Sequence, residues 1–175
     1  EGGHAATILF SGPTNIAARE AQSDLAEHFG VAAELWSVTS YKALREDGLG
    51  AERHNRLHPG GERRTPLVAR RLAEANGPIT AVSDFMAMVP DQIRQFLRDD
   101  DGDHRTFTTL GTDGMGRSDT REALRSFFEI NTGHIVVAVL SGLLADGAID
   151  ATVVQSAIER YEIDPDAVDP WNSYR

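Results

Sequence analysis

The sequence contains no cysteine, which excludes disulfide bonds, thiolate metal sites and cysteine nucleophiles. The N-terminal Glu1–His4 shows no basic segment followed by an apolar one, so we see no secretory signal peptide. No apolar run approaches the roughly 20 residues that a membrane span needs. The richest one, Ile135–Leu140, is too short. We therefore expect a cytoplasmic protein with no membrane partner.

Positive charge is also scarce. Lys and Arg together number 17 against 27 Asp and Glu, for a net charge of −10. Nucleic acids and anionic membranes both require clustered basic side chains, so we expect neither as a partner. The acidity favours solubility and leaves room for local basic patches. A length of 175 residues with ordinary globular composition suits one domain with a sizeable core.

The first part of the chain has the pattern of a βαβ unit. Ala5–Gly12 is a short apolar run typical of a buried strand in a parallel sheet. Thr14 is expected to cap the helix that follows, and Gly30 to end it in the left-handed conformation. Ala32–Val38 is the second expected strand. A parallel pair of this kind has a right-handed crossover.

Strands and helices continue to alternate along the rest of the chain. Ile79–Asp84 and Arg105–Thr112 are the next expected strands. His134–Asp146 has strand-like composition, but its unbroken length favours a buried helix. The other expected helices are Leu67–Ala75, one opening at Pro90, Thr120–Ile130 and one capped by Asp150. This pattern predicts a three-layer α/β sandwich, with a mostly parallel sheet of four or five strands and helices on both faces. The domain is expected to span residues 5–163, with a C-terminal tail at 164–175. The abrupt start at a buried-looking strand suggests that the chain is part of something longer.

Two stretches are predicted to be irregular. After a short helix at Ser40–Glu46, the polar segment Gly48–Arg64 contains glycines and lacks helical periodicity. A loop of that length is usually functional or packed against a neighbour. Asp99–Asp103 is an acidic turn, and it is a poor calcium loop because the glutamate required at the loop's end is missing.

His54 and His58 are four residues apart, as zinc ligands on one face of a helix would be. Asn55 stands where a metalloprotease would have glutamate, and Pro59 with two following glycines disfavours a continuous helix here. The sequence therefore argues against a metal site. Ser11 and Ser141 each precede a glycine, but neither lies in a Gly-x-Ser-x-Gly nucleophile elbow. No acid, base and nucleophile assemble into a catalytic set.

The most distinctive stretch is Leu110–Arg121, which reads LGTDGMGRSDTR at an expected strand-to-helix turn. Turns of this kind lie at the carboxyl edge of a parallel sheet, where ligands and partner surfaces gather. The order of its glycines reverses the dinucleotide fingerprint, and it is not a phosphate-binding loop of the Gly-Lys-Ser/Thr type. Two interpretations remain open: an anion site built from backbone N–H groups beside Arg117, or a turn whose charges pair with each other or with another domain. The candidate residues for either role are Asp113, Gly114, Gly116, Arg117, Ser118, Asp119 and Arg121.

Several segments, taken in order, resemble one known family. They are Trp36–Ser40, Glu52–Pro59, Leu110–Asp119 with the following Thr120–Glu122, and Phe128–Ile130. The chain resembles the C-terminal domain of the homodimeric pyruvate dehydrogenase decarboxylating component, in the transketolase superfamily. Met115 departs from the phenylalanine associated with that position, a change that preserves bulk.

The resemblance implies a fragment of a longer enzyme that decarboxylates pyruvate oxidatively and acetylates a lipoyl group, within the multienzyme complex that follows glycolysis. Thiamine diphosphate and Mg²⁺ would belong to the parent, because the Gly-Asp-Gly…Asn cofactor signature is absent here and Thr112–Gly114 does not replace it. We expect no bound cofactor, no catalytic residue and no activity in this piece alone. Implied partners are the other domains of the subunit, a second subunit of a homodimer, and the dihydrolipoyl acetyltransferase core. Two alternatives stay open: a stand-alone anion- or nucleotide-binding module using Gly111–Gly116, and a docking domain for the acyltransferase core.

Overall fold

The centre of the computed structural model, which describes residues 3–98 and 102–173, is a sheet of four parallel strands. The strands lie in the order β2-β1-β3-β4, so the chain moves outward in one direction from β1 and in the other from β3. All four carboxyl ends therefore meet at one edge of the sheet, and the switch point lies between β1 and β3. The bounds are β1 His4–Phe10, β2 Val31–Ser37, β3 Ile79–Val82 and β4 Phe107–Leu110.

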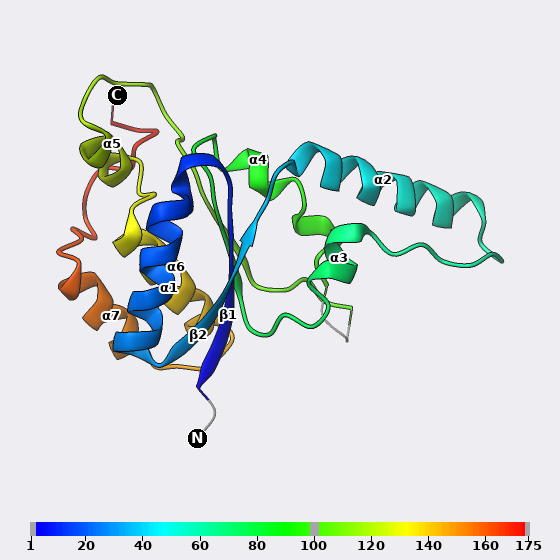
Figure 1. Ribbon diagram of the computed structural model, residues 1–175, viewed down its shortest axis with the longest axis horizontal. Helices are drawn as coiled ribbons and strands as arrows, with labels where there is room; N and C mark the ends of the chain where they lie inside the picture. The colour runs from blue at the N-terminus through cyan, green and yellow to red at the C-terminus, as the bar shows by residue number, and fades with distance from the viewer. Residues whose placement is uncertain (1–2, 99–101, 174–175) are drawn as a thin grey trace.

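Helices cover both faces of this sheet, as Figure 1 shows, which confirms the predicted three-layer α/β sandwich. On one side lie α1 Asn15–Phe29, α5 Arg121–Phe127, α6 Thr132–Ala145 and α7 Ala151–Arg160; on the other lie α2 Tyr41–Leu57, α3 Leu67–Arg71 and α4 Met88–Asp91. Two short 3-10 turns, η1 Gly12–Thr14 and η2 Arg94–Phe96, complete the described elements.

The pleat of β1 supplies a core to each side of the sheet. Ile8 and Phe10 pack with α1 and α6, whereas Leu9 points to the opposite face and packs with Tyr41 and Phe96. This alternation is the period-2 geometry of a strand buried on both faces.

The segment with ambiguous composition forms α6, as its length predicted. Val136, Val139 and Leu140 are fully buried, because α6 lies between the sheet, α1 and α7. In the described part of the chain, the helical stretch Arg121–Ala145 is long and apolar enough to cross a membrane by length and composition, and half of its apolar window is buried inside the domain. The buried part of this stretch packs in α6 against the sheet, α1 and α7.

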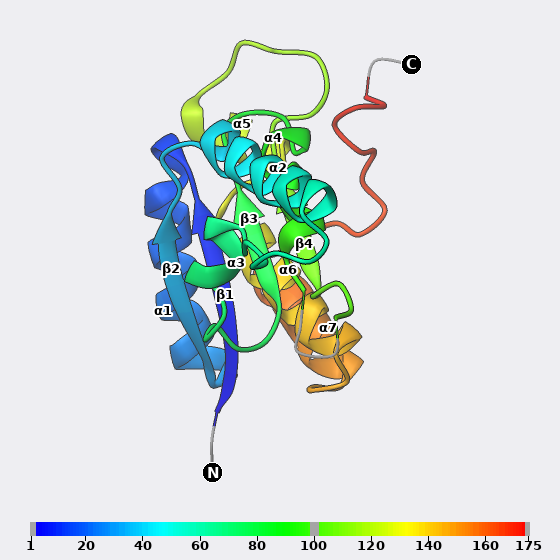
Figure 2. The same cartoon turned by 90° about the vertical axis from the view of Figure 1, so that its right-hand side faces the viewer.

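The prediction of an irregular segment at Gly48–Arg64 is wrong for Gly48–Leu57, which is helical, and confirmed for His58–Arg64. The helix α2 continues to Leu57 and projects from the body of the domain as an arm (Figures 1 and 2). Gly48 is needed within it because a Cβ there would lie 2.5 Å from the Phe96 ring. At the far end, the Asn55 side chain donates to the carbonyl of Arg64 and accepts from its N–H, both at 2.8 Å. These two hydrogen bonds hold the segment that follows α2 against the end of the helix.

Smaller differences concern helix ends. Gly30 adopts φ +65° as predicted, but the Thr14 hydroxyl donates to the Ser11 carbonyl at 2.8 Å instead of capping α1. The helix expected over Leu67–Ala75 ends at Arg71. Three of the aspartates in the predicted acidic turn, at 99–101, lie outside the described residues.

Candidate functional site

At the switch point on the carboxyl edge of the sheet, a hydrogen bond within the chain joins the two central strands. The Ser11 hydroxyl, just after β1, donates to the Ser83 hydroxyl, just after β3, at 3.0 Å. The Ser83 oxygen also accepts from the Phe85 N–H at 3.1 Å. The Ser11–Ser83 bond lies where an open α/β sheet usually receives its ligand.

Asp84 is a residue of this edge that the sequence analysis did not single out. Its Oδ1 atom is buried and has no hydrogen-bond partner. Gly12, at φ +58°, lets the carboxylate approach, since a Cβ there would meet Oδ1 at 2.8 Å. The available signal was a Ser-Asp pair directly after a buried strand, but nothing local showed which oxygen would be enclosed.

The first half of the predicted loop is anchored to the segment that follows β3. Gly111 lies so close to it that a Cβ would sit 2.2 Å from the Ala87 nitrogen. The Thr112 N–H donates to the Phe85 carbonyl at 3.0 Å, and the Asp113 carboxylate accepts from the Ala87 N–H at 2.9 Å. The role of Asp113 is therefore to hold two strand-end segments together.

The C-terminal tail lies against the same loop. Gly114 takes φ +111°, and a Cβ on it would lie 2.7 Å from the Pro170 carbonyl oxygen. Pro170 is buried, whereas the next residue, Trp171, is 59% exposed. Burial, and then the charge of Asp169 in the tail, raise the pKa of the Glu129 carboxyl above its usual range. The tail thus forms part of this edge of the domain.

The second half of the loop extends into solvent. Arg117 lies 4.0 Å from the Asp119 carboxylate, and its guanidinium stacks over the Phe127 ring at 4.4 Å. Gly116, Ser118 and Arg121 are exposed. An exposed ion pair of this length contributes little, and an exposed cation–π contact contributes about 0.5–1 kcal/mol. The seven candidate residues thus divide into an anchored group, Asp113 and Gly114, and an exposed group, Gly116, Arg117, Ser118, Asp119 and Arg121.

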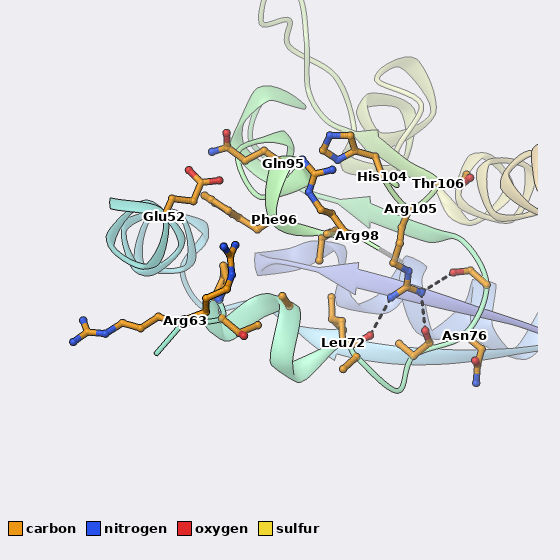
Figure 3. A pocket seen from close by; sticks show the side chains of 18 of the residues that line it. Glu52, Arg63, Leu72, Asn76, Gln95, Phe96, Arg98, His104, Arg105 and Thr106 are labelled. Atoms are coloured by element: carbon orange, nitrogen blue, oxygen red, sulfur yellow. Dashed lines mark hydrogen bonds between the residues drawn. The ribbon is translucent and has the colours of Figure 1, made fainter. Parts of the chain in front are cut away.

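A hollow of about 730 Å³, open to solvent, lies between the α2 arm, α3 and the start of β4 (Figure 3). Arg63 and Arg98 are among the residues that line it, and Arg105 closes one end. The Arg105 guanidinium donates to the carbonyls of Leu72, Ala75 and Gly77 at 3.0, 2.7 and 2.8 Å. Those bonds close the connection from α3 to β3, so Arg105 acts in the fold.

His54 and His58 lie on a continuous helix and its C-terminal cap, contrary to the sequence expectation. Their rings stack with centroids 4.3 Å apart. A zinc site needs at least three protein ligands. Among the residues that the structure describes, no group of three or more His, Asp or Glu side chains could hold a metal ion.

Comparisons with known proteins agree with the sequence motifs. The family described as transketolase-like TK C-terminal domain matches residues 1–131. The chain is similar to the pyruvate dehydrogenase E1 components of Mycolicibacterium smegmatis (46% identity over 91% of this chain and 16% of the relative) and Pseudomonas aeruginosa (41%, over 97% and 19%). The corresponding protein of Escherichia coli K12 is 41% identical over 93% of this chain and 18% of the relative.

Among solved structures, a split-gene transketolase described as an inactive beta4 tetramer matches with a TM-score of 0.55 and 17% identity, over 81% of this chain and 40% of that one. At that identity the likeness shows the fold alone. The chain spans less than a fifth of the length of the three curated relatives named above.

Proposed function

Because this chain belongs to the transketolase-like C-terminal domain family, as its motifs predicted, we propose that it is the C-terminal domain of a pyruvate dehydrogenase decarboxylating subunit and that its own role is assembly. The observation that carries the proposal is that more than nine-tenths of the chain matches each of these three relatives, at 41–46% identity. The parent enzyme would decarboxylate pyruvate oxidatively and acetylate a lipoyl group, in the cytoplasm.

The site geometry supports an assembly role for this part of the subunit. At the carboxyl edge, the Ser11 and Ser83 hydroxyls bond to each other, and the Gly111–Asp113 segment anchors the residues after β3. Large apolar and charged side chains at this edge, such as Met115 and Arg117, face solvent. Such groups are suited to contact with another protein surface. Thiamine diphosphate and Mg²⁺ would be held by other domains of the parent, which supply the decarboxylation chemistry. The partners of this domain would be those domains, a second subunit of a homodimer, and the acyltransferase core.

Activity of the longer polypeptide tests the enzyme assignment. With thiamine diphosphate and Mg²⁺ present, it should reduce an artificial electron acceptor when given pyruvate, and respond much less to 2-oxoglutarate. The isolated chain should show no activity and no calorimetric signal with thiamine diphosphate. A longer polypeptide without pyruvate-dependent turnover would refute the assignment, and tight cofactor binding by the isolated chain would refute the division of roles.

The anion-binding alternative is tested on the isolated chain. Titration with phosphate, acetyl-CoA and nucleotides should give no heat of binding if the Gly111–Gly116 loop serves assembly. Tight binding that Arg117→Ala abolishes would establish the alternative instead. Retention of the chain by the peripheral subunit-binding domain of the acyltransferase, lost at high salt, would favour the docking role.

A further inference from the structure

The three methionines of the chain all lie at the carboxyl edge of the sheet, and all three are exposed. Met86, Met88 and Met115 have 49%, 69% and 64% of their surface accessible. Phe85 and Trp171 beside them are 62% and 59% exposed. We call these five side chains the carboxyl-edge patch. Grouped large apolar side chains mark a docking surface far more often than scattered ones do.

The residues of the patch come from three segments that lie against one another: the loops after β3 and β4, and the C-terminal tail. The loop after β4 is bonded to the segment after β3 through Thr112 and Asp113, and Gly114 packs on the tail at Pro170. Phe85, Met115 and Trp171 are therefore carried on a preformed platform. A rigid surface loses little conformational entropy when a partner binds, and methionine side chains adapt to the partner's shape.

A carboxylate with an unused oxygen lies at the base of this platform. The Asp84 carbonyl accepts from the Thr112 hydroxyl at 2.9 Å, which fixes the residue, while its side-chain Oδ1 is buried without a partner. A buried acceptor left unpaired is costly, but this atom is already enclosed by the chain, so a partner on the exposed patch does not reach it.

We propose that the carboxyl-edge patch is the surface on which the preceding domains of the parent polypeptide pack, through an apolar surface of their own. The inference rests on the proposed function, and it is supported by the length of chain that lies outside this structure: the relatives extend over more than five times the length matched here. A second copy of this chain fits poorly. Each copy carries a net charge of −10, which opposes the association of two copies.

Methionine oxidation by hydrogen peroxide tests the proposal with probes that the protein already contains. Trypsin separates the sites, since Leu72–Arg94 carries Met86 and Met88 while Thr106–Arg117 carries Met115. In the isolated chain all three should oxidise at the rate of an exposed methionine. In the longer polypeptide their rates should fall about tenfold or more, because oxidation follows exposure. Equal rates in the two proteins would overturn the proposal, and so would protection in the isolated chain that rises with its concentration.

Variants locate the contact within the patch. In the longer polypeptide, Phe85→Ser should restore much of the oxidation rate at Met88 and Met115. Leu57→Ser is the matched control, since Leu57 is 53% exposed on the α2 arm, away from the patch. The unfolding of both isolated variants should match that of the parent chain, which excludes misfolding as the cause. Activity is measured on the same samples: protected methionines without pyruvate turnover would refute the function alone, and turnover with exposed methionines would refute this surface alone.

Discussion

The two edges of the parallel sheet are completed in different ways. At the amino edge, the Arg105 side chain donates hydrogen bonds to three backbone carbonyls before β3. Thr106, which precedes β4, donates a hydrogen bond from its hydroxyl to the Asp146 carboxylate after α6. At the carboxyl edge, the buried Oδ1 of Asp84 has no partner and Met88 is 69% exposed. The amino edge is thus covered by contacts within the chain, although the Thr7 hydroxyl in β1 is also buried without a partner, whereas the carboxyl edge leaves large apolar side chains exposed. This asymmetry is the basis on which we propose that the carboxyl edge faces the other domains of a longer polypeptide.

The largest expected effect is a loss of stability at the amino edge, where Gly77 lies against β1 with no room for a side chain. Gly77 has φ +71°, and a Cβ there would lie 1.9 Å from the Ala5 carbonyl oxygen. Gly77→Ala should therefore lower the free energy of unfolding by about 3 kcal/mol or more, through backbone strain and steric overlap together. Urea denaturation followed by circular dichroism measures this.

Gly147→Ala is the matched control for that change. Gly147 has nearly the same φ, +70°, but nothing lies within 4 Å of the added Cβ. Only the conformational cost of about 1 kcal/mol should remain. Equal losses in the two variants would show that the overlap at Gly77 relaxes freely, and that the amino edge is less tightly closed than its contacts indicate.

Gly111→Ala makes the corresponding test at the carboxyl edge. This glycine does not have a positive φ, so the effect is steric: the Cβ would lie 2.2 Å from the Ala87 nitrogen and 2.6 Å from the Phe85 carbonyl oxygen. We expect a loss of about 2–3 kcal/mol in the free energy of unfolding. Gly116→Ala, in the exposed half of the same loop with open space around it, should change it by less than about 0.5 kcal/mol. If both variants were neutral, the platform under Phe85 would not be rigid.

The sequence predicted the layers of this fold better than it predicted its edges. The unbroken apolar run of α6 could only be a long buried element, so its length decided its type. The α2 arm was missed because Gly48 and Gly50 each weaken a helix by about 1 kcal/mol relative to alanine. Its support comes from elsewhere, through the fit of Gly48 on the Phe96 ring and the two hydrogen bonds between Asn55 and Arg64.

The candidate site shows the same limit. The sequence located the Gly111–Arg121 turn, but not that Asp113 is anchored to Ala87 while Arg117 stacks on Phe127 in solvent. It also gave no sign that Phe85 and the methionines are exposed. Apolar residues after a strand have the composition of a core, and only the tertiary arrangement shows which of them remain uncovered.

Asp113→Ala separates anchoring from docking within the loop. The carboxylate accepts a half-buried backbone hydrogen bond from Ala87, so its loss should lower the free energy of unfolding of the isolated chain by about 1.5 kcal/mol. Asp119→Ala removes an exposed carboxylate 4.0 Å from Arg117 and should cost less than about 0.5 kcal/mol. Equal effects would contradict the division of the loop into an anchored and an exposed half.

The smallest expected effect concerns pH and the end of α6 near the carboxyl edge. Burial lowers the pKa of His134, whose Nδ1 lies 2.7 Å from the Asn131 side-chain oxygen. The unfolded chain therefore takes up a proton at a higher pH than the folded one. The stabilisation associated with the neutral ring is fully present above the unfolded pKa of about 6.5, and it is lost as pH falls toward the folded value. Between about pH 7.5 and 5.5, the free energy of unfolding should thus fall more steeply in the parent chain than in His134→Gln. The other histidines are present in both proteins, so the difference between the two slopes reports on position 134. Identical slopes would mean that this end of α6 admits water, which would make the carboxyl edge open in its interior as well as on its surface.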